Sequence, residues 1–119
     1  MNTTNIGNRA ESAVSSYLED HGHEIVVRNW RTRMCEIDIV STSENEDGEN
    51  EIFFVEVKMR ESDHFGGGIG AISQSKLRQM TRAAELFIAQ HSEFSDHQPL
   101  LAAAIVNGNF AVQNFIILD

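Results

Sequence analysis

The sequence predicts a single α/β domain over residues 1–119, in which helices flank a mixed β-sheet in the order α-β-β-β-α-β-β. A length of 119 residues with 41% hydrophobic content suits one modest core and is too short for two. Two segments repeat apolar residues at helical spacing, and the segments around them are rich in β-branched and aromatic residues. The second helical segment connects the third and fourth β-rich segments, and such a crossover makes the two strands parallel.

The first predicted helix covers residues 6–22, IGNRAESAVSSYLEDHG. Its apolar stripe consists of Ile6, Ala10, Ala13, Val14, Tyr17 and Leu18. Gly22 is suited to end it, because glycine adopts the left-handed backbone conformation common after a helix.

Two β-rich runs follow at residues 23–31 and 35–43. The second run alternates two sets of side chains, Glu36, Asp38 and Val40 against Ile37 and Ile39. An acidic loop with the turn signal Asp47-Gly48 separates this run from a third strand at residues 50–60. We therefore expect the second and third strands to form an antiparallel hairpin with a long loop.

The third strand contains the segment FFVEVKMR, whose two faces differ in character. Successive side chains of a strand point to opposite faces. One face is apolar throughout and consists of Phe53, Val55, Val57 and Met59. The other begins apolar and becomes ionic, in the order Ile52, Phe54, Glu56 and Lys58. This change is typical of a strand whose end opens onto a cleft.

The remaining elements follow in a simple order. Residues 61–73 are rich in glycine and are interpreted as a flexible connection. Residues 73–92 predict the second helix, with Ser73 or Ser75 as its N-cap. After Pro99, residues 100–106 and 109–118 read as strands, joined at the hairpin signal Asn107-Gly108.

Charge argues against nucleic acid when it is taken alone. The net charge of −9 produces a field that repels a polyanion. The acids are concentrated in SENEDGENE, residues 43–51, whereas most lysines and arginines lie outside it. No apolar run is long enough for a membrane span and the N-terminus lacks signal-peptide character, so we expect a cytoplasmic protein with no membrane partner.

The chemistry of the sequence lies in acids placed on neighbouring strands. Asp38 and Glu56 are each inside an apolar run, and Glu36 and Lys58 lie two residues along the same faces. Converging carboxylates repel each other and are costly to desolvate, so a cation must offset them. Lys58 supplies one charge, and a hard divalent ion such as Mg²⁺ or Mn²⁺ supplies more. The alternative interpretation of Glu56 and Lys58 is an ordinary ion pair at the end of a strand.

An aspartate followed by Glu-Val-Lys on the next strand resembles the PD-(D/E)XK nuclease motif. The segments GNRAESAVSSYLEDHGHEIVVRNWRTRMCEIDIV and FFVEVKMRESDHFGGGIGAISQSKLRQM resemble the YraN-like family of small uncharacterised bacterial proteins. That family is similar to restriction endonucleases and Holliday junction resolvases, which implies a restriction endonuclease-like core.

The resemblance also implies roles for individual residues. Asp38 and Glu56 would be metal ligands, with the backbone carbonyl of Val57 as a further ligand and Lys58 as the catalytic lysine. Glu11 on the first helix would approach the same metal, and Glu36 is an additional candidate. Five basic residues are candidates for contacts with substrate phosphates: Arg28, Arg60, Lys76, Arg78 and Arg82.

Three functions follow from these features. The first is a Mg²⁺- or Mn²⁺-dependent DNA nuclease, acting on branched or flapped DNA, that binds DNA weakly and in a salt-sensitive manner. The second is a nucleic-acid-binding module on the same fold that does not cleave, and the third is a protein-interaction module that uses the acidic loop. A homodimer is compatible with each. Trp30 is interpreted as a core residue rather than a platform for base stacking.

Overall fold

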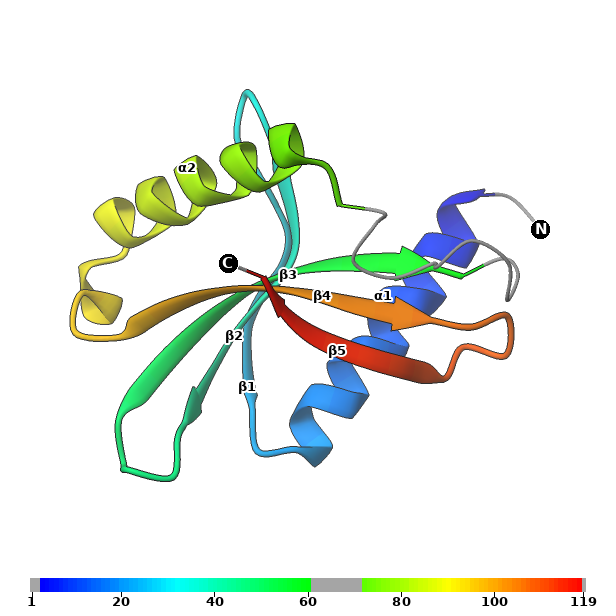
Figure 1. Cartoon of the computed structure of the whole chain (residues 1–119), viewed down its shortest axis with the longest axis horizontal. Helices are drawn as coiled ribbons and strands as arrows, with labels where there is room; N and C mark the ends of the chain where they lie inside the picture. Colours follow the sequence, from blue (N-terminus) through cyan, green and yellow to red (C-terminus); the bar gives the residue numbers. More distant parts are fainter. Residues whose placement is uncertain (1–2, 61–71, 119) are drawn as a thin grey trace.

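A computed structural model describes residues 3–60 and 72–118. The two α-helices and five strands of these residues follow one another along the chain in the predicted order (Figure 1). Their bounds are α1 Thr3–Asp20, β1 Glu24–Arg31, β2 Glu36–Glu44, β3 Asn50–Met59, α2 Gln74–Gln90, the short 3-10 helix η2 Ser92–Phe94, β4 Gln98–Val106 and β5 Val112–Leu118. The mixed α/β architecture predicted from the sequence is therefore confirmed.

The strands form one five-stranded sheet in the order β1-β2-β3-β4-β5. β3 and β4 are parallel and are joined by the crossover that contains α2, whereas the other neighbours are antiparallel. α1 lies on one face of the sheet and α2 on the other (Figure 1). The predicted hairpin of β2 and β3 and the predicted parallel pair are both present.

The side chains of β3 alternate between the two core layers as predicted. Phe53 and Val55 pack with α1, and Ile52 and Phe54 pack with α2. All four of these side chains are buried. Because the central strand is covered on both faces, only its C-terminal end, which carries Glu56 and Lys58, is free to carry polar groups toward a site.

Both helices have the predicted capping residues. α1 ends in a Schellman motif, in which His23 N–H donates to the Leu18 carbonyl and Gly22 N–H donates to the Glu19 carbonyl. Gly22 has a φ of 89°, a left-handed value that glycine tolerates best. Ser73 is the N-cap of α2, and its hydroxyl accepts a hydrogen bond from Lys76 N–H.

Two details near the C-terminus differ from the prediction. Pro99 lies inside β4 rather than before it, and a proline is tolerated there because the pairing of β4 with β5 starts only at Leu101 and Leu118. The turn at Asn107-Gly108 is longer than a two-residue hairpin. The Asn107 side chain accepts hydrogen bonds from the N–H groups of Asn109 and Ala111, and this bonding favours the longer turn.

One predicted pattern in β2 is wrong. Ile37 and Ile39 were expected to share a face, but Ile37 packs in the core layer of α2 and Ile39 in that of α1. The pairing of β2 with β3 stops at Ile39 and Val55. Beyond that point the β1–β2 hairpin rises toward α2, which brings Ile37 to the other core layer (Figure 1).

The acidic loop lies within the described residues, whereas most of the glycine-rich segment does not. The loop connects β2 to β3 at the end of β2 opposite Asp38. The proposed flexible connection falls mostly on residues 61–71, outside the described residues. Within residues 3–60 and 72–118, no helix combines the length and apolar character needed to cross a bilayer.

Substitutions of Gly22 and Gly7 test the assigned end and interior of α1. Gly22→Ala should lower the melting temperature by about 4 °C, because a β-carbon at a left-handed φ costs about 1 kcal/mol. Gly7→Ala is the matched change inside α1, where a β-carbon meets no atom within 4 Å. It should raise the melting temperature by a similar amount through helix propensity. Equal effects of the two changes in thermal unfolding would contradict the assigned end of α1.

Candidate metal centre

The site forms where β2 and β3 separate. After the pair Ile39 and Val55, the two strands no longer form backbone hydrogen bonds with each other. Instead the Asp38 carboxylate accepts a hydrogen bond of 2.7 Å from Val57 N–H. In a strand the N–H and C=O of one residue point to the same side, so the Val57 carbonyl also faces this gap.

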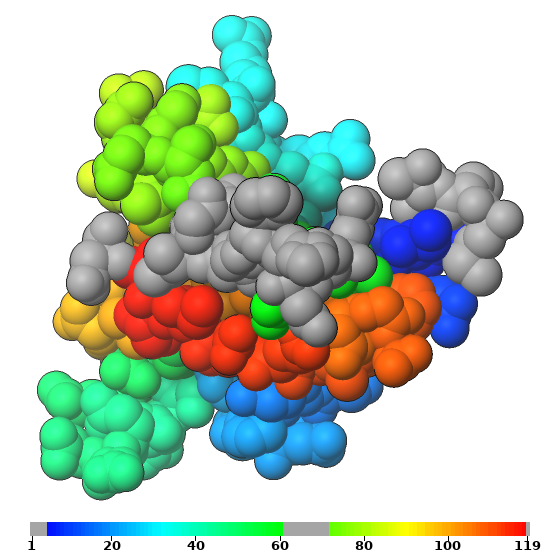
Figure 2. All heavy atoms as spheres, turned by 45° about the vertical axis from the view of Figure 1, so that its right-hand side comes forward, coloured from blue at the N-terminus to red at the C-terminus, as the bar shows by residue number. Residues whose placement is uncertain are grey.

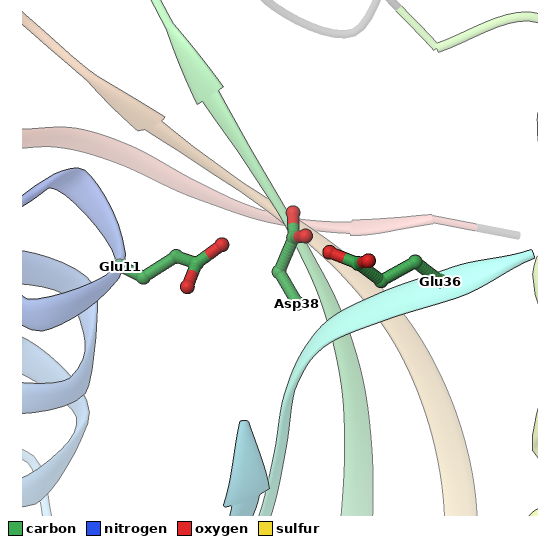
Figure 3. Close-up of side chains that lie close together, drawn as sticks. All are labelled: Glu11, Glu36 and Asp38. Atoms are coloured by element: carbon green, nitrogen blue, oxygen red, sulfur yellow. The ribbon is translucent and has the colours of Figure 1, made fainter. Parts of the chain in front are cut away.

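Carboxylates from α1 and β2 gather at the gap. Glu11, Glu36 and Asp38 each offer an oxygen within 4.8 Å of the others. Figure 3 shows Glu11 reaching from α1 toward Asp38, and Glu36 reaching toward it from the other side. Glu11 is buried, whereas Glu36 and Asp38 are partly buried. Residues 25 positions apart in the sequence are therefore brought together by packing α1 against the sheet.

Glu56 joins this group from β3. Burial, followed by a hydrogen bond with the Glu56 carboxyl, raises the pKa of Asp38 to about 8. The negative charges of Glu56 and Glu11 raise it further, and the Val57 N–H opposes them. Asp38 therefore holds a proton near neutral pH. We refer to Glu11, Glu36, Asp38 and Glu56 as the acid cluster.

Three basic side chains lie against the acid cluster. Arg28 of β1 is 3.6 Å from Glu11, Lys76 of α2 is 3.2 Å from Glu56, and Arg31 pairs with Glu36. Burial lowers the pKa of Lys76, but the charge and hydrogen bond of Glu56 outweigh it and raise that pKa overall. Arg28 also donates to the Ser12 hydroxyl and the Asn8 carbonyl, so it fastens β1 to α1.

The other predicted site residues lie at different distances from this centre. Lys58 shares a face of β3 with Glu56 but forms no ion pair among the described residues. Arg60 donates to Gln113 on β5. Arg78 is exposed on α2, where it lines a shallow pocket with Arg82. The structure thus brings Lys76 and Arg28 into contact with acids and leaves Arg78 open to solvent.

The donor set fits a hard divalent cation. Glu11 Oε1 is buried and accepts no hydrogen bond from the described residues, and Arg28, the cation paired with it, lies 3.6 Å away, beyond hydrogen-bond distance. All the candidate ligands are oxygens, the ligand type preferred by Mg²⁺ and Mn²⁺. A cation here would give the Glu11 oxygen a closer partner and would favour the ionised form of Asp38.

The sequence did not indicate the ion pair between Lys76 and Glu56. The predicted contact of Lys76 with substrate phosphates stays a prediction. No sequence pattern indicated that Cys35 would be buried. Its thiol lies beside Lys76, and burial raises the pKa of that thiol.

The fold and the acid cluster define a small α/β protein with a candidate cation site. The chain belongs to uncharacterised protein family UPF0102, whose family model matches residues 10–107. This confirms the predicted family relationship, and the matched range includes the whole acid cluster.

Individual relatives carry the same family name. A UPF0102 protein of Geobacter metallireducens is 39% identical over 93 residues, covering 78% of this chain and 72% of the relative. One of Caldicellulosiruptor saccharolyticus is 40% identical over 88 residues, covering 74% and 70%. One of Mycobacterium sp. strain JLS is 35% identical over 88 residues, and there the chain spans 63% of the relative's length.

The raised pKa of Asp38 predicts how stability depends on pH. Between about pH 4 and 8 the folded protein keeps a proton on Asp38 that the unfolded chain has lost, so its stability falls as pH rises. The slope is at most about 1.4 kcal/mol per pH unit. Asp38→Asn mimics the protonated acid, so it should flatten this dependence and be the more stable protein at pH 8.

Urea unfolding of both proteins in EDTA, at several values between pH 5 and 8, measures the difference. His23, whose pKa is lowered by burial, contributes an opposite pH dependence that is common to both proteins and cancels. A variant that is less stable than the parent throughout this range would mean that Asp38 acts as a structural partner of a cation.

Proposed function

We propose that the protein is a Mg²⁺- or Mn²⁺-dependent nuclease that hydrolyses phosphodiester bonds in DNA, with branched or flapped DNA as its substrate class. The proposal includes a restriction endonuclease-like core of the PD-(D/E)XK type. The observation that carries it is the convergence of Asp38, Glu56 and Glu11 at the point where β2 leaves β3. Lys58 lies on the same face of β3, two residues beyond Glu56.

Asp38, Glu56, Glu11 and the Val57 carbonyl are the proposed holders of the cation, with Glu36 as an additional ligand. When bound, such an ion polarises a phosphodiester and lowers the pKa of a bound water. The Val57 N–H fixes the orientation of Asp38, and Arg28 holds Glu11 toward the gap. Lys58 is the proposed group that orients the attacking water or stabilises the charge that develops on the phosphate.

The distribution of charge supports weak and local DNA binding. The acidic loop lies at the end of β2 opposite Asp38, about 20 Å away at 3.3 Å per residue. That distance exceeds the screening length of about 8 Å at physiological salt. Basic residues outside the acidic loop, including Arg78 on α2 and Arg60 after β3, can therefore contact phosphates despite the net charge of −9. Few such contacts make the affinity low and salt-sensitive.

A second candidate function is a nucleic-acid-binding module that does not cleave. It is favoured by the position of Lys76, whose ammonium is already paired with Glu56 inside the acid cluster. A lysine there offsets part of the charge that a divalent ion would otherwise neutralise. The two candidates differ in whether a cation displaces this pairing.

Cleavage assays on linear, flapped and four-way DNA with Mg²⁺ or Mn²⁺ test the nuclease directly. Asp38→Asn and Lys58→Met should each reduce cleavage by about 100-fold or more, because each removes a group that acts on the reacting phosphate. Glu93→Gln, an exposed acid of η2, is the control for loss of one carboxylate and should cleave normally. DNA binding without any metal-dependent cleavage would instead favour the second function.

Metal binding itself can be measured without activity. A ligand that binds only the folded state raises its stability by mass action, so the melting temperature of the parent protein should keep rising with the logarithm of the Mn²⁺ concentration above the Kd. Asp38→Asn should lose most of this stabilisation while melting at a higher temperature than the parent in EDTA at pH 8. An unaltered response of this variant to Mn²⁺ would remove Asp38 from the site.

A further inference from the structure

We propose that a groove beside the acid cluster binds an unpaired strand of nucleic acid. The groove lies between the β1–β2 turn and α2, which are side by side in the space-filling view (Figure 2). Its volume is about 410 Å³. The residues that give it its chemistry are Trp30, Arg31, Arg33, Met34, Arg82 and Leu86, and we call it the arginine groove.

The wall formed by the β1–β2 turn is held in one conformation. The Thr32 hydroxyl accepts hydrogen bonds from the N–H groups of Met34 and Cys35 and donates one to the Cys35 carbonyl. Thr32 N–H also donates to that carbonyl. Arg33 and Met34 are therefore presented by a fixed turn, so little conformational freedom is lost when a ligand binds them.

Apolar surface is exposed in this groove to an unusual extent for a polar protein. Met34 and Leu86 are 53% and 42% exposed, and they are among the four large hydrophobic residues exposed in the described chain. Trp30 packs edge-on against Phe87 and is only partly buried, so part of its ring lines the groove. Such surface suits the flat faces of nucleobases.

The charged residues of the groove are all basic. Arg31, Arg33 and Arg82 are exposed, and no acid is among the lining residues. This is three of the nine lysines and arginines in a chain that has 18 acids. Guanidinium groups beside apolar and aromatic surface match a ligand with phosphates and exposed base faces. A duplex hides its base faces by stacking, so the matching ligand is an unpaired strand.

The arginine groove is continuous with the acid cluster. Arg31 lines the groove and pairs with Glu36, whose carboxylate lies within 4.8 Å of those of Asp38 and Glu11. A strand in the groove would thus lead directly to the proposed catalytic site. The assignment of the ligand as nucleic acid rests on the proposed function. Binding of an unpaired strand in the groove narrows the proposed substrate to DNA that has an unpaired arm.

The chain contains one tryptophan, and it lies in the groove, so it reports binding without a label. Titration of the full chain with a short oligothymidylate in EDTA should quench the Trp30 fluorescence. A duplex of the same length should quench it much less. The logarithm of the binding constant should fall linearly with the logarithm of salt concentration, with a slope near −2 for about three phosphate contacts.

Matched variants locate the contacts. Arg33→Gln and Arg82→Gln should each weaken binding several-fold at low salt and reduce the slope by about 0.7. Arg9→Gln makes the same change of charge on α1, on the opposite face of the sheet, and should leave the titration unchanged. Met34→Ala should weaken binding with little change in slope, because it removes apolar contact and no charge.

Three results would overturn the proposal. They are an absence of quenching, equal effects of Arg9→Gln and Arg33→Gln, and stronger quenching by an acidic peptide than by the oligonucleotide, which would indicate a protein partner. Glu93→Gln, at an exposed acid of η2, should bind the oligothymidylate as the parent does. If all proteins bind the oligothymidylate but none cleaves DNA, the arginine groove stands and the nuclease proposal fails.

Discussion

The hydrogen bond from Val57 N–H to Asp38 is the interaction on which the rest of the site depends. A sheet strand that loses its neighbour leaves backbone groups unpaired, and these are costly when buried. Here the Asp38 side chain of β2 accepts the hydrogen bond that the β2 backbone would otherwise accept. The Val57 N–H of β3 therefore stays paired where the two strands separate. At the gap that results, α1, β2 and β3 all direct carboxylates to one point.

Concentrating acids in this gap links protonation, cation binding and stability. Near neutral pH the acid cluster is balanced by the proton on Asp38 and by the side chains of Lys76, Arg28 and Arg31. A bound cation can replace the proton or a basic side chain only if the folded protein holds the carboxylates in place. The surrounding apolar layers hold them, because Val55 and Phe54 lock β3 between the two helices.

The sequence was most informative where local patterns decide the structure. Alternation in FFVEVKMR assigned both faces of β3, and Gly22 and Ser73 marked helix ends because capping depends on a few neighbouring residues. It was least informative where distant segments meet. The pairing of Lys76 with Glu56 and the shift of Ile37 to the other core layer depend on how far β2 departs from β3, which no local pattern encodes. The family relationship was predicted correctly, while the roles assigned to the site residues all remain predictions.

The position of the acidic loop gives the molecule a strong electric polarity along β2. The β1–β2 turn with its arginines precedes β2, and the acidic loop follows it, so the strand separates two regions of opposite sign by about 30 Å. In the field of an extended polyanion such a body experiences a torque that turns its arginine end inward. At about 0.01 M salt, where the screening length is about 30 Å, encounters with a polyanion would therefore favour one orientation, with the acidic loop turned away.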